Sequence, residues 1–458
     1  MNIKTIRQIQ DEMKKGIITS RQLCIDLIQR IAEYDSCEGG LNSIAEINPD
    51  ALSIASELDK ERSLGKIRGP MHGIPVMIKA NINTADKMHT TAGSMALKDN
   101  FAPYDAAIVG NLRASGVVIL GKTNLTEFAN FMTKNMSNGY SSLGGQVLCP
   151  YDKDADPCGS STGSAVSVAA GLCPAAIGTE TSGSIICPSW TNGIVGIKPT
   201  GELIPGEGII PISGTLDTAG PMARSVADAA ALLGAMTGKG DSFSKGLGSA
   251  TLKGKRIGLN KFNLDDIGED KAAVYEKLTG LLESNGAKLI ELPGMDHNFN
   301  LKYFLYYEFK NNMNHYLSTL NPGFGIKTMD DIIDFNKANK KKALKYGQFY
   351  LLQAKYFSSG RCIEADYLKA LKAREDQIKE LESLFRENDL DAILHANIYN
   401  NLAAFTGCPS ITIPTGLDSK GMPMGMQMIS WKFNDRTLIE TAYALEKALD
   451  IQLVPPGF

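Results

Sequence analysis

Residues 158–188 read CGSSTGSAVSVAAGLCPAAIGTETSGSIICP, and this stretch decides the fold. Small residues run through 163–170, which predicts a helix with hydroxyl side chains in its first turn. An apolar run at 174–178 predicts a short buried strand, and the glycine and hydroxyl residues of 179–183 predict a tight turn. A helix followed by a buried strand is typical of a sheet that helices cover. Here both ends of that unit carry serines.

The segments before this stretch show the same alternation of helix and strand. Residues 19–35 have apolar residues at four-residue spacing, and residues 49–65 open with proline and stop at glycine, so both segments are predicted helices. GIPVMIKANI at 73–82 predicts a buried strand. A predicted helix then ends near Gly116 and a strand follows at 117–120. This rhythm predicts an α/β fold whose sheet is covered by helices on both faces.

The composition changes between about residue 298 and residue 387, where aromatic residues and Lys/Asn-rich stretches dominate. We read this part as a helical insertion that packs on the sheet. Strand patterns resume in DAILHAN, SITIPTG and GMQMIS. The sequence therefore predicts a single domain, with N-terminal helices at 1–70, an α/β core at 71–297 and 388–458, and the insertion at about 298–387.

Bulk composition excludes several classes of protein. The chain has 458 residues, 43% of them hydrophobic, and a net charge of −3, so it lacks the basic excess typical of nucleic-acid-binding proteins. It has no run of about 18 apolar residues, which a membrane-spanning helix needs, and no apolar segment of a secretory signal. We therefore expect a cytoplasmic protein with no nucleic-acid partner and no membrane span.

The cysteines and histidines do not indicate a metal site. None of the eight cysteines forms a CxxC pair, and the five histidines show no ligand spacing. In a cytoplasmic protein we expect the cysteines to be reduced structural thiols.

A serine nucleophile needs a base, and three candidates are present. His395 lies at a predicted strand end, where a histidine is more often a core residue, and no GxSxG motif accompanies it. The SxxK pattern of Ser242 and Lys245 falls in a glycine-rich loop, where a solvated lysine stays protonated. Lys79 follows an apolar strand, where burial would lower its pKa toward neutrality. On the residues alone, a strand-end lysine that reaches solvent is the commoner case.

Several motifs, in the same order along the chain, resemble those of the amidase signature family. Residues 156–200 contain CGSSTGSAVSVAAG and GTETSGSIICPSWTNGIVGIKPT, which are similar to the family's signature. RGPMHGIPVMIKANINT resembles the family's lysine motif, and DTAGPMARSVADAA and NLAAFTGCPSITIPTG are also typical. The likeness covers most of residues 20–235 and 390–450 and is greatest to the peptide amidase branch. It implies the amidase-signature fold, a twisted central mixed β-sheet covered by helices on both faces.

The resemblance also assigns roles to residues. It implies that Ser184 is the nucleophile, that Ser160 relays its proton to Lys79, and that the peptide bond between Gly159 and Ser160 is cis. It further implies an oxyanion hole of four backbone N–H groups, those of Thr181, Ser182, Gly183 and Ser184. For the other hydroxyl residues of the first turn we expect turn and N-cap roles. The implied activity is hydrolysis of a small-molecule or peptide amide through an acyl-enzyme, with no metal or cofactor.

Five positions depart from the family's pattern. Ala80 stands where the family has aspartate, Ser182 where glycine or aspartate is common, and Trp190 where residues are small. Leu148 and Cys149 replace polar residues. The departures leave the catalytic three in place, but they predict a less polar pocket and put the substrate in doubt.

Other functions stay open at this point. An acyl-enzyme in a dry pocket could pass its acyl group to an amine, which would make the protein an amide-forming acyltransferase. Ala80 also leaves room for a catalytically impaired binding scaffold. The motifs resemble those of a tRNA-dependent amidotransferase less well. Open too are whether the chain forms a homodimer and whether the aromatic residues of the insertion shape an acyl pocket or only fill a core.

Overall fold

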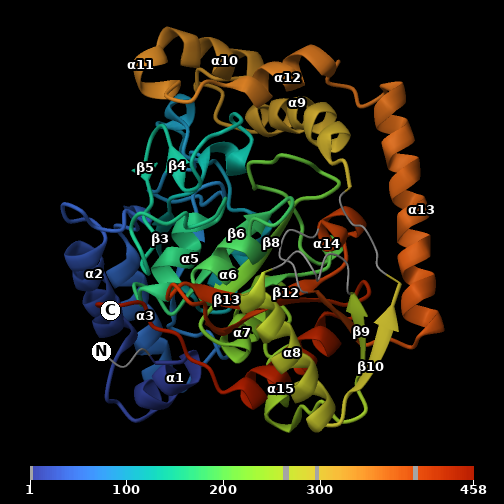
Figure 1. The fold of residues 1–458 in the computed structure, drawn as a ribbon. Helices are drawn as coiled ribbons and strands as arrows, with labels where there is room; N and C mark the ends of the chain where they lie inside the picture. Colours follow the sequence, from blue (N-terminus) through green and yellow to red (C-terminus); the bar gives the residue numbers. More distant parts are fainter. Residues whose placement is uncertain (1–3, 261–267, 294–298, 396–400) are drawn as a thin grey trace.

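The computed structural model describes residues 4–260, 268–293, 299–395 and 401–458, and in these ranges the centre of the protein is a mixed β-sheet (Figure 1). Eleven described strands hydrogen-bond side by side. In sheet order they are β1 (Ile44–Ile47), β3 (Val118–Thr123), β2 (Pro75–Lys79), β6 (Ala175–Glu180), β8 (Thr218–Ala223), β7 (Val195–Lys198), β12 (Ser410–Leu417), β13 (Pro423–Ile429), β11 (Ala392–His395), β9 (Arg256–Asn260) and β10 (Lys288–Leu292). A separate hairpin pairs β4 (Tyr140–Ser141) with β5 (Gly145–Gln146).

Helices pack on both faces of the sheet, as the sequence predicted. One hydrophobic cluster joins Val76 and Ile78 of β2 to α1 (Ile6–Lys14), α4 (Ala107–Ala114), α7 (Val226–Met236), α8 (Glu269–Ser284) and α15 (Asp435–Leu449). A second cluster joins Met77, on the opposite face of the same strand, to α2 (Ser20–Tyr34), α3 (Ala51–Ser63) and α5 (Thr162–Ala169). Because neighbouring residues of one strand enter different clusters, the sheet is buried on both sides.

The order and direction of three strands position the site. β2 runs parallel to both of its neighbours, β3 and β6, so the carboxyl ends of all three lie at one edge of the sheet. β6 pairs antiparallel with β8, which brings the start of β8 to the same edge. Lys79 ends β2 and Glu180 ends β6, so the residues that follow each strand meet there.

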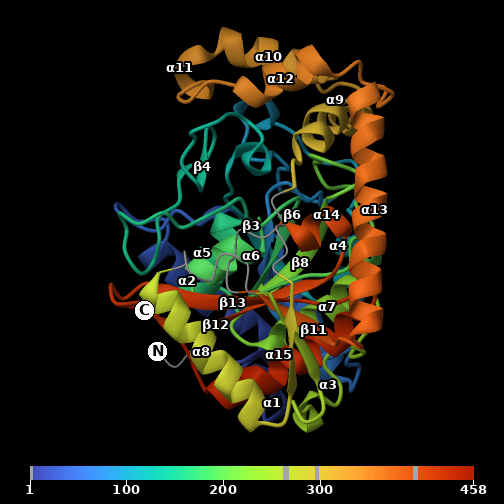
Figure 2. The ribbon, with the colours of Figure 1, turned by 45° about the vertical axis from the view of Figure 1, so that its right-hand side comes forward.

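The insertion consists of helices in the described residues. They are α9 (Lys302–Ser318), α10 (Met329–Ala338), α11 (Lys340–Ala343), α12 (Phe349–Phe357) and α13 (Ala365–Glu387). In both views α10, α11 and α12 lie at one end of the molecule, and α13 runs along its side (Figures 1 and 2). Phe304 and Phe309 of α9 are fully buried, and the rings of Phe309 and Phe131 lie 4.5 Å apart. These aromatic residues therefore fill a core.

The remaining short elements connect the layers. They are α6 (Ile186–Thr191), α14 (Leu402–Thr406) and the 3-10 helices η1 (Met95–Leu97), η2 (Glu127–Asn130), η3 (Gly201–Leu203) and η4 (Leu247–Ser249).

Two sequence predictions differ from the structure in detail, and a third falls partly outside the described residues. The N-terminal part holds a strand, β1, besides its helices, because Ile44 and its neighbours pair with the edge of β3. The turn predicted at 179–183 begins at Thr181, since Thr179 and Glu180 still pair with β8. Residues 396 and 397 of the strand predicted in DAILHAN lie outside the described residues.

Candidate active site

Lys79 is the last residue of β2, and its side chain is fully buried, with 0% exposed. Its Nζ lies 2.8 Å from Ser160 Oγ, 3.0 Å from Ser161 Oγ, and 3.0 and 3.2 Å from the Oγ1 and carbonyl oxygen of Thr179. All four of these oxygens are uncharged. The side chain of this strand-end lysine thus points into the protein rather than to solvent, and it contacts one of the two serines singled out by the sequence.

The surroundings of Lys79 lower its pKa from 10.5 to about 7. Burial is the main cause, because the ammonium form loses its hydration. The carboxylates of Asp217 and Glu180 act in the opposite direction and favour the charged form. Near neutral pH, a large share of Lys79 therefore has a lone pair that can accept a proton.

Ser160 and Ser161 differ in what their hydroxyl protons can do. Ser161 occupies the N-cap position of α5, but its Oγ donates to the carbonyl oxygen of Thr179 at 3.0 Å and accepts from the Thr179 N–H at 3.2 Å. The hydroxyl proton of Ser161 is therefore already engaged in a hydrogen bond with Thr179. Within the described residues, the Oγ of Ser160 is bonded to Lys79 alone. Of the two hydroxyls, that of Ser160 is the one free to donate to a neutral Lys79.

The backbone before Ser160 is tightly enclosed. The peptide bond between Gly159 and Ser160 is cis, as the resemblance implied. A Cβ on Gly159 would collide with the Oγ1 of Thr126, so only glycine fits there. Thr162 donates from its Oγ1 to the carbonyl oxygen of Cys158 at 2.7 Å, which fixes the loop on the other side.

Ser184 lies in a turn formed by residues 181–184, directly after β6. Gly183 has a φ of +77°, a conformation that favours glycine. The carboxylate of Glu180 accepts hydrogen bonds from the N–H groups of Ile185 at 2.7 Å and Ile186 at 3.0 Å, which holds the two ends of the turn together. The N–H groups of residues 181–184 form no hydrogen bond with the part of the chain that the structure describes, so they can bind a ligand oxygen.

The two serine-bearing turns are in direct contact. The N–H of Ser161 donates to the carbonyl oxygen of Ser184 at 3.1 Å. Ser184 keeps 7% of its surface exposed, and its Oγ has no hydrogen-bond partner among residues 4–260, 268–293, 299–395 and 401–458. The structure thus brings Lys79, Ser160 and the turn of Ser184 together from segments that are far apart in the chain.

A disulfide joins Cys158 to Cys187, and the expectation of reduced thiols is wrong for this pair. The two Cα atoms lie 6.0 Å apart although 29 positions separate the residues in the sequence. Helix α5 and strand β6 return the chain on itself, so the loop that carries Cys158 and the short helix α6, which carries Cys187, become neighbours. Trp190, a departure from the family's pattern, packs against Cys187 and covers the bridge.

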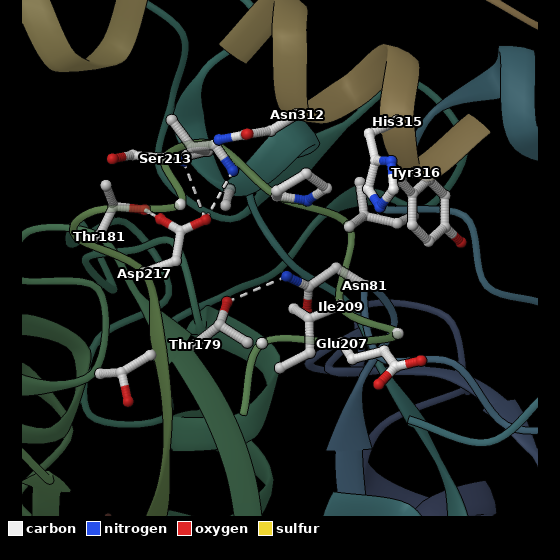
Figure 3. A pocket seen from close by; sticks show the side chains of 18 of the residues that line it. Asn81, Thr179, Thr181, Glu207, Ile209, Ser213, Asp217, Asn312, His315 and Tyr316 are labelled. Carbon is white, nitrogen blue, oxygen red and sulfur yellow. Dashed lines mark hydrogen bonds between the residues drawn. The ribbon is translucent and has the colours of Figure 1, made fainter. Parts of the chain in front are cut away.

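A cavity of about 510 Å³ lies beside the start of the turn at 181–184, where Thr181 lines it (Figure 3). Its lining includes Thr179, which bonds Lys79, and Asp217, which accepts a hydrogen bond from Thr181 Oγ1 at 2.5 Å. Asn81 donates from its Nδ2 to Thr179 Oγ1 at 3.0 Å. From the insertion, α9 adds three lining residues, Asn312, His315 and Tyr316. The insertion therefore shapes the space next to the lysine as well as filling a core.

The two rival bases lie elsewhere. His395 is buried on β11, bonded to Asn260, and four strands separate β11 from β6 in the sheet. Lys245 is exposed on its loop. Neither residue pairs with a serine turn as Lys79 does.

The remaining departures from the family's pattern have local explanations. Ala80 is buried, and its carbonyl oxygen accepts hydrogen bonds from the N–H groups of residues 91 and 92. The four oxygens around Lys79 come from other segments of the chain, so they do not depend on a side chain at position 80. Ser182 donates to the Oδ1 of Asn401 at 2.5 Å. Leu148 packs against the hydrophobic cluster that contains Met77 and α5, so an apolar side chain is favourable at this position, and Cys149 is buried.

The described ranges contain neither a metal-binding cluster nor a membrane-spanning helix. Their side chains contain no group of three or more metal-ligating residues that could hold an ion. None of the helices described has the length and apolar composition needed to cross a bilayer.

Sequence reasoning missed four residues of the site, Ser161, Thr179, Glu180 and Asp217. The last three lie in the GTET and DTAG segments that carried the resemblance. A signal was therefore present, but it did not distinguish residues that support the site from those that only build strands.

Residues 26–439 match the family model described as Amidase. The chain belongs to the amidase family. A "Probable amidase" of Arabidopsis thaliana is 35% identical over 99% of this chain and 91% of its own length. One component of the glutamyl-tRNA(Gln) amidotransferase of Halorhodospira halophila is 32% identical over the whole of both chains.

Among solved structures, native peptide amidase from Stenotrophomonas maltophilia superposes with a TM-score of 0.90 at 38% identity, covering 99% of this chain and 98% of that one. The amidase-signature fold and the likeness to peptide amidase that the motifs implied are thus confirmed. As a member of the amidase family, the protein is an amide-acting hydrolase.

Proposed function

We propose that this amidase-family protein hydrolyses a carboxylic amide with Ser184 as nucleophile, Ser160 as proton relay and Lys79 as base. The observation that carries the proposal is the buried Nζ of Lys79, 2.8 Å from Ser160 Oγ and largely free of its proton above about pH 7. A base with a pKa near the working pH is the most effective proton acceptor in such a reaction.

In the first step, the Oγ of Ser184 forms a bond to the carbonyl carbon of the amide. Its proton passes to Ser160 while the proton of Ser160 passes to Lys79, which becomes an ammonium ion. The electron pair of the carbonyl π bond moves onto the oxygen. The N–H groups of residues 181–184 stabilise that oxyanion, and such a donor contributes about 3 kcal/mol in related sites.

In the second step, the proton returns from Lys79 through Ser160 to the leaving nitrogen, and the C–N bond breaks. Ammonia or an amine departs, and the acyl group stays on Ser184 as an ester. Water then gives a proton to the same relay and attacks the ester, which releases the carboxylic acid and restores the serine.

The substrate we propose is a small-molecule or peptide amide, on the strength of the likeness to peptide amidase. The likeness to an amidotransferase component supports a second candidate, in which an amine rather than water takes the acyl group. The two differ only in the acceptor of the last step, so product analysis separates them.

The test of the catalytic residues is labelling with a fluorophosphonate, followed by peptide mass spectrometry. We expect one adduct, on Ser184, that is absent in Ser184→Ala and forms at least about 100-fold more slowly in Lys79→Met. An adduct on another serine, or equal rates in the wild type and Lys79→Met, would contradict the proposal. No adduct at all would indicate a binding scaffold.

The test of the reaction is a panel of primary amides, peptide amides and anilides, assayed with and without an added amine. We expect acid and ammonia or amine as products. A product that forms only when amine is added would instead favour the acyltransferase.

A further inference from the structure

The carboxylate of Asp217 contacts both the turn at 181–184 and the loop of residues 212 and 213, and the proposed reaction gives this carboxylate no role. Asp217 precedes β8 and lines the cavity, and its Oδ1 accepts a hydrogen bond from Thr181 Oγ1 at 2.5 Å (Figure 3). Its Oδ2 accepts hydrogen bonds from the N–H groups of Ile212 at 2.7 Å and Ser213 at 3.0 Å. The side chain is therefore held at both oxygens, and it holds the first residue of the turn at 181–184.

The insertion supports the loop that carries Asp217. Glu308 of α9 accepts hydrogen bonds from the Oγ of Ser213 at 2.5 Å and from the N–H of Thr215 at 3.0 Å. The hydroxyl of Tyr367 on α13 donates to the same carboxylate at 2.7 Å. Two helices that belong to the insertion thus fix the position of a loop at the edge of the core sheet.

Asp217 also acts on Lys79 through its charge. Of the acidic groups near Lys79, Asp217 has the largest effect, and Glu180 comes next. In the proposed reaction Lys79 takes up a proton while the substrate oxygen becomes negative. A fixed negative charge near the amine favours the ammonium form, and it needs no rearrangement during the reaction.

We propose that Asp217 is a positioning residue, an inference that rests on the proposed function. Asp217 holds Thr181 in the turn at 181–184 and balances the positive charge that forms on Lys79. Hydrogen bonds from Thr181, Ile212 and Ser213 favour its ionised form, whereas burial and the charge of Glu308 raise its pKa to about 6. The other ionisable side chains on the cavity wall are those of Tyr104, Glu207, His315 and Tyr316.

Two variants separate the two roles. In Asp217→Asn the amide oxygen can accept from Ile212 and Ser213 while the amide nitrogen donates to Thr181 Oγ1, so the contacts remain and the charge is lost. In Thr181→Val the charge remains and the contact is lost. Asp228→Asn is the matched control, because Asp228 is a buried carboxyl with a pKa raised by burial to about 6 and bonded to the N–H of Ile6.

The measurement is the pH dependence of kcat/KM on an amide that the wild type hydrolyses. We expect Asp217→Asn to move the acid limb about one pH unit toward acid, and Asp228→Asn to leave it in place. We expect Thr181→Val to lower kcat about tenfold with the limb unmoved. The rate of fluorophosphonate labelling against pH gives the same limb without turnover.

An acid limb in Asp217→Asn at the wild-type position, with Lys79→Met inactive, would overturn this inference and leave the proposed function standing. A Thr181→Val enzyme with wild-type kcat would overturn the positioning role. Hydrolysis retained by Lys79→Met would instead overturn the proposed function, and this inference with it.

Discussion

The pH dependence of hydrolysis between pH 6 and pH 8 tests the central feature of the site, a lysine that is neutral because it is buried. With a pKa of about 7, Lys79 is unprotonated in about one molecule in eleven at pH 6 and in about ten in eleven at pH 8. We therefore expect kcat/KM to rise roughly tenfold across this range, to reach half its maximum near pH 7, and to level off above pH 8.

A lysine with its ordinary pKa of 10.5 would behave differently. Only about 0.03% of it would be neutral at pH 7, and the rate would rise about tenfold for each pH unit up to pH 10. The assay is initial-rate hydrolysis of a primary amide at constant ionic strength. A rate that still climbs steeply above pH 8, or that does not change between pH 6 and pH 8, refutes the reasoning.

The matched variant for this experiment is Lys79→Met, which fills the same buried space without a titratable group. Between pH 7 and 10.5 the unfolded chain binds more protons at Lys79 than the folded chain does, so stability rises with pH through this window. Methionine removes the free-energy cost of burying a lysine that is protonated in the unfolded chain. We expect Lys79→Met to lose activity at least about 100-fold and yet to melt no lower than the wild type at pH 7, which excludes unfolding as the cause.

Three further outcomes follow from the geometry. Ser160→Ala should lower kcat at least about 100-fold with the melting temperature unchanged. Ser161→Ala should keep measurable turnover but lower the free energy of unfolding by about 1–3 kcal/mol, because it removes the acceptor of the Thr179 N–H. Enzyme kinetics and urea unfolding distinguish the two variants. Gly183→Ala should lower the free energy of unfolding by about 1–2 kcal/mol from its φ of +77° alone, since no atom lies within 4 Å of the added Cβ, and kcat should fall if the turn at 181–184 shifts. A variant with wild-type kcat and stability would contradict this. Reduction of the Cys158–Cys187 disulfide, which closes a loop with a sequence separation of 29, should lower the free energy of unfolding by about 3–4 kcal/mol. Equal urea midpoints with and without reductant would contradict this prediction.

The sequence determined most of the local structure. The spacing of apolar residues at 19–35 predicts a helix that the structure places at Ser20–Tyr34, and the strand pattern before Lys79 becomes β2. Such patterns are readable because a helix or strand buries one face at a fixed period, whatever its neighbours are. The motifs around Ser160 and Ser184 likewise carried the family assignment, because they recur in a constant order.

The sequence could not decide the state of Lys79. The same strand-end lysine would stay protonated on a surface, and its pKa falls only because the fold buries its amine between β6 and the loop of Ser160. The resemblance singled out Ser160, but no local pattern explains the choice, because Ser160 and Ser161 are adjacent and chemically identical. What separates them is Thr179, a residue of another strand that occupies the proton of Ser161 alone.

Dependence on distant segments also explains why the sequence did not reveal the disulfide or the contacts of Asp217. Cys158 and Cys187 meet, and Asp217 reaches Thr181, only after the chain between them has folded into α5, β6 and the strands that follow. Periodicity and motif order are properties of neighbouring residues, so the sequence alone determined the elements and the family. Desolvation, hydrogen-bond partners and charge balance depend on atoms from distant segments, and these were decided only by the tertiary structure.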